Sequence, residues 1–147
     1  MMKRRADWEQ RLFAFLNEAR GQTFDWGTFD CATGLAAGAV EAQTGQDLAA
    51  EFRGLYEGEA AAIKLLKREG WLGDDRDFAM GMEAMMDAFL KRAPKGRRHR
   101  GNIVLLETEE GPGLTVRVGA EVVGMSRSGG TRLFKPPVGA PEWTVAP

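Results

Sequence analysis

The spacing of apolar residues changes from helical to extended near residue 95, and this change constrains the fold more than any other feature of the sequence. Before that point, apolar residues recur every three or four positions, which is typical of helices that bury one face. The spacing predicts four helices, over residues 5–19, 31–43, 59–69 and 78–92. The segment Pro94-Lys95-Gly96 ends the pattern, because proline and glycine interrupt regular helices.

Beyond the break, the periodicity changes to that of short β-strands separated by turn residues. The predicted strands cover residues 103–106, 114–118, 121–125, 132–134 and 143–145. We expect the stretch 110–113 to be the loop between the first two strands, and Gly119-Ala120 to form a tight turn before the third. The sequence thus predicts one α+β domain over residues 1–147, with a helical half over about 1–95 and a sheet half over about 100–147.

The composition is that of an ordinary folded protein. Of 147 residues, 44% are hydrophobic and 28% are charged, which excludes wholesale disorder. The 20 Lys and Arg residues nearly balance the 21 Asp and Glu residues, and the net charge of -1 excludes a globally basic nucleic-acid binder. We expect no membrane span, because no apolar run approaches the ~18 residues that a span needs. The charged start of the chain differs from a secretory signal peptide, so we expect synthesis in the cytoplasm.

The segment 24–33 is the most informative part of the sequence about function. It places Asp30 and Cys31, the only cysteine, at the start of a predicted helix. The positive end of the helix dipole favours a thiolate at Cys31, whereas the charge of Asp30, a natural N-cap, raises the thiol pKa. Two interpretations follow: a reactive thiol, or a small buried hydrophobe like most lone cysteines. In the second, Trp26 packs over the helix start, Gly27 allows a tight turn and Asp30 caps the helix.

The motif Trp26-Gly27-x-x-Asp30-Cys31, preceded by Phe24, resembles that of an uncharacterised family of small phage and prophage proteins. The resemblance continues through residues 44–47, 52–56 and 100–106 and ends at Trp143. That family is similar in turn to the NlpC-type cell-wall peptidases, which have a papain-like fold with a helical half followed by a small antiparallel sheet. Tailed phages and gene-transfer agents commonly encode such a protein near their tail-tip genes. The resemblance therefore implies an NlpC-type papain-like fold and makes Cys31 a candidate nucleophile.

Catalysis by Cys31 needs a histidine that takes up the thiol proton. In NlpC-type enzymes a Gly-Asp pair begins one strand and the histidine begins the next. By this resemblance Gly101-Asn102 matches the Gly-Asp pair, and Gly113 or Leu114 holds the histidine position, where neither can act as a base. The only histidine, His99, lies two residues upstream of that pair and is the one candidate base. The resemblance thus implies a degenerate peptidase that is kept for its shape.

A short basic run, from Lys95 to Arg100, follows the last predicted helix. Arg97, Arg98 and Arg100 make it a candidate contact for an acidic partner or for anionic cell-wall polymers, and a solvated loop is the alternative. Aromatic residues do not interleave with the basic ones, so the run lacks the pattern of a nucleic-acid site. The sequence contains neither a phosphate-binding glycine loop nor metal-ligand spacing, so we expect no cofactor and no metal.

Three functions remain open on this sequence. The one we favour, implied by the resemblance, is a structural or assembly component of a phage tail tip or baseplate, or of a phage-like particle such as a gene-transfer agent. Its partners would be other tail or baseplate proteins, with peptidoglycan as a further contact. The second is a cysteine hydrolase, a peptidoglycan endopeptidase or amidase, with Cys31 as nucleophile and His99 as base. The third is a free cytoplasmic binding module that presents the basic run.

Overall fold

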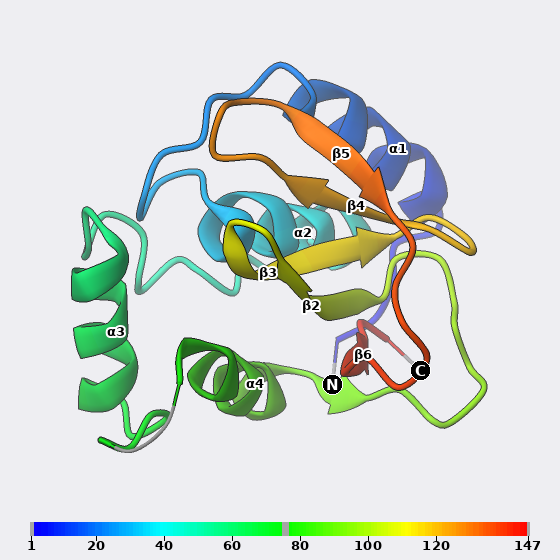
Figure 1. The fold of residues 1–147 in the computed structure, drawn as a ribbon. Coiled ribbons are helices and arrows are strands. Elements are labelled where there is room, and N and C mark those ends of the chain that lie inside the picture. Colours follow the sequence, from blue (N-terminus) through cyan, green and yellow to red (C-terminus); the bar gives the residue numbers. More distant parts are fainter. Residues whose placement is uncertain (1, 75–76, 147) are drawn as a thin grey trace.

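Four α-helices and a six-stranded antiparallel sheet form the structure, a computed structural model that describes residues 2–74 and 77–146 (Figure 1). The helices are α1 (Trp8–Ala19), α2 (Ala37–Thr44), which continues directly from a π-helical segment η1 (Cys31–Ala36), α3 (Glu59–Arg68) and α4 (Phe78–Phe89). The strands are β1 (Lys91–Arg92), β2 (Ile103–Thr108), β3 (Gly111–Arg117), β4 (Val122–Met125), β5 (Thr131–Phe134) and β6 (Glu142–Thr144), in the sheet order β1-β6-β2-β3-β4-β5. The predicted α+β class is confirmed, with every helix preceding every strand. None of the helices in the described ranges is long and apolar enough to cross a membrane.

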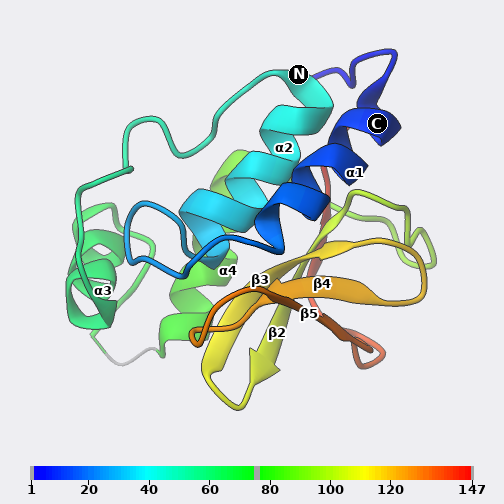
Figure 2. The same ribbon diagram turned by 90° about the horizontal axis from the view of Figure 1, so that it is seen from above.

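The main core lies between the helices and one face of the sheet. Figure 2 shows α1 and α2 side by side over the sheet, whereas α3 stands at the edge of the molecule. Leu12 of α1, Leu35 of η1, Met86 of α4 and Leu114 of β3 are buried in this core together with Trp143 of β6. Burial of these side chains is the main stabilising contribution to such a packing. It holds η1 directly against β3, which fixes where the start of that helix lies on the sheet.

The last helix ends earlier than the sequence predicted. We expected a helix to residue 92, but α4 ends at Phe89 and Lys91–Arg92 form β1, so the end of that prediction is wrong. The residue after the helix has an extended backbone, with φ -129° and ψ 161°. β1 pairs with β6, where Arg92 lies opposite Trp143 and its guanidinium is 4.9 Å from the ring centroid. Pairing with a strand from the end of the chain overrides helix propensity here.

The loop predicted at residues 110–113 is also wrong for its last three residues. β3 begins at Gly111, which pairs with Thr108 of β2, so Glu109 and Glu110 alone connect the two strands. Gly111 has a φ of 106°, which glycine adopts without the strain of a side chain. The Thr108 hydroxyl donates a 2.7 Å hydrogen bond to the Gly111 carbonyl. A tight hairpin therefore replaces the longer loop.

A buried ion pair ties β3 to β6, the two strands that flank β2. The Arg117 side chain is 2% exposed, and its Nε and Nη2 donate hydrogen bonds of 2.9 and 2.8 Å to the Glu142 carboxylate. The side-chain amide of Asn102 donates a further hydrogen bond of 2.8 Å to Glu142. Asn102 is the residue matched by resemblance to the aspartate of the Gly-Asp pair, and here it holds the carboxylate of this ion pair.

Candidate functional site

The turn that leads into η1 requires glycine at position 27. Gly27 has a φ of +83°, and a Cβ built on it would lie 2.0 Å from the Tyr56 carbonyl oxygen. The Gly27 carbonyl accepts a 2.9 Å hydrogen bond from the Gly54 amide. These contacts hold the turn against the loop that leads to α3. A side chain at position 27 would therefore meet both backbone strain and a collision.

Asp30 organises the start of η1 through both of its carboxylate oxygens. The residue is 2% exposed. Its Oδ1 accepts hydrogen bonds from the amides of Ala32 and Thr33, at 2.9 and 2.8 Å, and from the Thr33 hydroxyl at 3.0 Å. Its Oδ2 accepts hydrogen bonds from the Gly27 amide at 2.9 Å and the Tyr56 hydroxyl at 2.5 Å. Asp30 is thus the N-cap of the helix, and its charge is satisfied by the turn, the helix and Tyr56 together.

Cys31 opens η1 beside this carboxylate and is half-buried against the core. Burial, followed by the charge of Asp30, raises the pKa of the Cys31 thiol from its ordinary value of 9.0 to about 12. The backbone of Leu114 and the charge of Arg127 favour the thiolate, but their influence is smaller. The thiol therefore stays protonated at neutral pH, because desolvation and Asp30 outweigh the groups that stabilise negative charge.

Alkylation of Cys31 should show this high pKa directly. Only the thiolate reacts, so we expect labelling by iodoacetamide at about pH 8 to be about a thousandfold slower in the folded protein than in the unfolded chain. The folded rate should still climb about tenfold per pH unit at about pH 9 to 10. Mass spectrometry of samples quenched along a pH series measures both rates. A folded rate that levels off below about pH 8 would show an activated thiolate and contradict this pKa.

Gly113 and Leu114, the two positions where the resemblance places a histidine, line the same cleft as Cys31, whereas His99 does not. Leu114 packs in the same core as Cys31, is 1% exposed, and supplies an apolar side chain where the resemblance expects an imidazole. His99 is exposed and lines a second hollow, which shares no described lining residue with the cleft at Cys31. Figures 1 and 2 both show the loop between β1 and β2 on the opposite side of the molecule from the start of the helix that contains Cys31.

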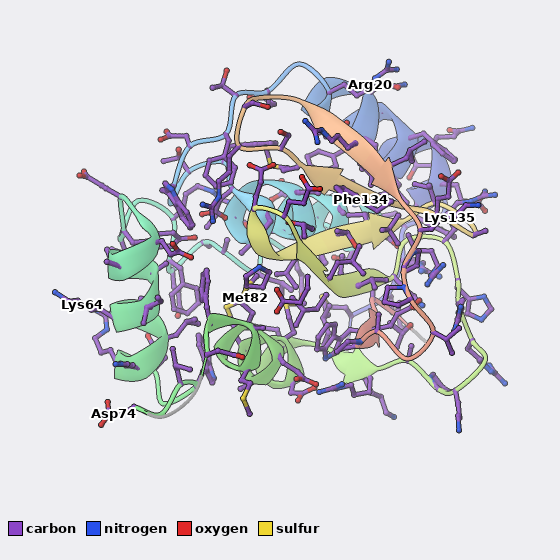
Figure 3. All side chains as sticks on the ribbon, viewed as in Figure 1. Arg20, Lys64, Asp74, Met82, Phe134 and Lys135 are labelled. Carbon is purple, nitrogen blue, oxygen red and sulfur yellow. The ribbon has the colours of Figure 1, made fainter. Side chains whose placement is uncertain are left out.

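Cys31 lines an apolar cleft of about 120 Å³. Eight aromatic side chains contribute to the described lining: Phe24, Trp26, Phe52, Tyr56, Trp71, Phe78, Phe89 and Phe134. Three of them, Phe52, Trp71 and Phe89, pack edge to face with centroids 5.7 to 6.0 Å apart. Met82 of α4 also lines the cleft and lies between α4 and the sheet (Figure 3). A cavity of this kind has room for an apolar group about the size of a benzene ring.

The described lining of this cleft contains no histidine. Its titratable side chains are Asp30, Cys31, Tyr56, Glu110 and Arg127. Burial, together with the adjacent Asp30 carboxylate, raises the pKa of the Tyr56 hydroxyl. Glu110 accepts hydrogen bonds from the Arg127 amide at 2.9 Å and the Ser126 hydroxyl at 3.3 Å. The site thus offers a neutral thiol with apolar walls rather than a thiol–histidine pair.

Two further motif segments turn out to support the start of η1. Arg53 donates a 2.9 Å hydrogen bond to the Thr33 carbonyl and forms an ion pair with Asp47 at 2.5 Å. Tyr56, from the same segment, donates to Asp30. From the sequence, residues 44–47 and 52–56 are points of resemblance with no predicted role. The spacing of these residues in the chain does not predict their contacts with the start of η1, because the contacts are made across a loop.

Comparison with known proteins places the chain in a family without assigning it an activity. No curated protein matches the sequence. Residues 3–140 match the sequence profile of a domain of unknown function, DUF6950. That match spans most of the chain, so this protein belongs to the DUF6950 family.

Proposed function

We propose that this protein is a non-hydrolytic domain with an NlpC-type papain-like fold that serves as a structural or assembly component of a phage tail tip, baseplate or phage-like particle. One observation carries the proposal: Gly27 and Tyr56 hold the Asp30 carboxylate beside Cys31, while Gly113 and Leu114, the two positions where the resemblance expects a histidine, cannot act as a base. A site with its scaffold intact and its base replaced is what a domain retained for shape would have.

The order of elements supports the papain-like part of the proposal. A helix that begins at the cysteine packs on an antiparallel sheet formed by the later part of the chain. This is the arrangement that the resemblance to NlpC-type peptidases implies. The proposed location of the protein in a particle is based on the resemblance to phage and prophage proteins.

An active cysteine hydrolase is the second candidate, because Cys31 lines an open cleft at a helix N-terminus. It requires a base other than His99, which lines the second hollow instead. Because the pKa of the Cys31 thiol is about 12, such an enzyme would hold almost none of its nucleophile as thiolate at neutral pH.

Quantifying the protein in purified particles tests the proposed role. Particles from a strain that encodes the chain should contain it in a constant ratio to the major tail protein, measured by mass spectrometry with labelled reference peptides. The same ratio should persist after a high-density gradient that removes loosely bound protein. Recovery of the protein only in the soluble fraction, with none in the particles, would contradict the role.

The exposed basic loop should contribute to incorporation. Replacing Arg97, Arg98 and Arg100 with serine is expected to leave the melting temperature nearly unchanged, because exposed charges and exposed ion pairs contribute about 1 kcal/mol or less. It should lower the amount of protein per particle, and high salt should lower wild-type incorporation too, because salt screens exposed charges.

A matched control is the substitution of Arg20, Lys64 and Lys135 with serine, which removes the same charge from other exposed positions (Figure 3). We expect this control to be incorporated like the wild type. Equal incorporation of both triple variants would show that the basic run is a solvated loop and not a partner contact.

A further inference from the structure

A second hollow, of about 580 Å³, lies beside the edge strand β1 and is separate from the cleft at Cys31. Four parts of the chain line it, and the lining residues are Arg4, Trp8, Glu9, Lys91, Arg92, Pro94, Arg97, His99, Arg100, Thr144 and Ala146. Five of these are Lys or Arg and one is Glu, on a chain whose net charge is only -1. Positive charge is therefore concentrated here, and the rest of the molecule is net negative. We call this hollow the basic groove.

Some of the positive charge in the basic groove is already neutralised by neighbouring carboxylates. Arg92 forms ion pairs with Glu83 at 2.7 Å and Asp87 at 2.6 Å, and Arg100 pairs with Glu9 at 3.0 Å. Within the described residues, Arg4, Lys91 and Arg97 take part in no such pair. Three cations thus face one hollow without a salt bridge to a described carboxylate, an arrangement that favours an anionic ligand.

Arg4 is the most constrained of these three cations. It is half-buried, its guanidinium lies 4.0 Å from the Trp8 ring centroid, and it donates hydrogen bonds to the Gln43 side chain at 3.0 Å and the Arg100 carbonyl at 3.2 Å. Burial lowers the pKa of Arg4, and Glu9 offsets this only in part. A guanidinium held in place by neutral acceptors while partly removed from water gains most from an added carboxylate.

We propose that the basic groove binds an extended acidic segment of a neighbouring protein, whose carboxylates pair with Arg4, Lys91 and Arg97. This rests on the proposed function for the existence of such a neighbour in the particle. The length of the groove exceeds what a single small anion fills, because its lining runs from β1 through the loop to both ends of the described chain. β1 is an edge strand, so an extended segment can lie along it.

The same surface is poorly suited to nucleic acid. Single-stranded nucleic acid binds by stacking its bases on aromatic side chains. Trp8 is the one Phe, Tyr or Trp among the described lining residues of the groove, and its ring is covered by the Arg4 guanidinium. A long polyanion would also run from the groove onto the net negative remainder of the molecule. A short acidic protein segment avoids both problems.

Binding of labelled hexaglutamate, followed by fluorescence anisotropy at low ionic strength, tests the proposal on the purified full chain. The test variant is Lys91→Gln with Arg97→Gln, and the matched control is Arg20→Gln with Lys64→Gln, which removes the same charge elsewhere. We expect the wild type and the control to bind alike, and the test variant to bind about tenfold or more weakly. A thymidine hexanucleotide should bind the wild type more weakly than hexaglutamate, and millimolar phosphate should displace the peptide only in part.

Several results would overturn the proposal. These are no hexaglutamate binding, equal binding by the test and control variants, tighter binding of the oligonucleotide, or full displacement by phosphate, which would indicate a simple anion site. The assay contains no particles, so its outcome is independent of the proposed function. Hexaglutamate binding by a protein that is absent from particles would support the proposed binding site in the basic groove and contradict the proposed role in the particle. Presence of the protein in particles without hexaglutamate binding would support the proposed role and contradict the proposed binding site in the basic groove.

Discussion

Replacing Gly27 with valine should lower the free energy of unfolding by about 3 kcal/mol or more and the Tm by about 10 °C. The loss has two sources. The backbone at this residue has a φ of +83°, and a Cβ would lie 2.0 Å from the carbonyl oxygen of Tyr56. Backbone atoms cannot swing aside as a side chain can, so the turn and the Asp30 contacts beside it must shift. Thermal and urea unfolding followed by circular dichroism measure the change.

Gly54 provides a matched control that separates these two sources. It also has a φ of +83°, but a Cβ built on it meets no atom within 4 Å. Gly54→Val should therefore show the backbone strain alone, about 1 kcal/mol, while Gly27→Val shows strain and collision together. Cys31→Ala should also cost less than Gly27→Val, because it removes only a small group. A loss for Gly27→Val no larger than for Gly54→Val or Cys31→Ala would contradict this account of the turn.

Glu142→Gln is expected to destabilise the protein by about 3 to 5 kcal/mol, because it leaves the charge of Arg117 buried without its anion. Arg117 is 2% exposed and donates two of its three side-chain hydrogen bonds to Glu142, and the third to the Gly119 carbonyl at 2.8 Å. Asn102 would also exchange a charged acceptor for a neutral one. The urea midpoint of the variant against that of the wild type measures the loss.

The exposed pair of Arg100 with Glu9 serves as the control for this second prediction. Both side chains are about half exposed, at 44% and 54%, so Glu9→Gln should cost about 1 kcal/mol or less. The double variant Arg117→Met with Glu142→Gln should lose less stability than Glu142→Gln alone, because no buried charge is then left without a partner. Equal losses for Glu142→Gln and Glu9→Gln would mean that the Arg117 pair contributes no more than a surface pair.

The sequence was sufficient for those elements whose pattern is local. Apolar spacing predicts a helix over residues 5–19, and the structure confirms it as α1 (Trp8–Ala19), which begins three residues later than predicted. The short apolar run from Ile103 to Leu106 lies in β2 as predicted. The two-residue strand β1 could not be predicted in this way, because it exists only by pairing with β6 from the end of the chain. The early start of β3 likewise depends on its pairing with β2.

The candidate site also combines local features, which the sequence predicts, with long-range contacts, which it does not. Helix capping by Asp30 and the turn at Gly27 are local, so residue type and position were enough to suggest them. The roles of Tyr56 and Arg53 depend on a loop that folds back on the helix start, and no spacing rule reports such a contact. Leu114 lies near Cys31 because η1 packs on β3. Only the family resemblance, and no local pattern, indicated this packing from the sequence.

A peptidoglycan cleavage assay tests most directly whether Cys31 lacks a catalytic base, as the described lining of its cleft indicates. Purified wild-type protein and its Cys31→Ser variant are incubated with peptidoglycan fragments, and newly released amines are quantified over time, with an active cell-wall peptidase as the positive control. We predict that the wild type releases no more amine than Cys31→Ser, because burial and Asp30 raise the thiol pKa to about 12 and the described lining of the cleft contains no histidine. Amine release by the wild type that Cys31→Ser abolishes would contradict the claim and establish a hydrolase.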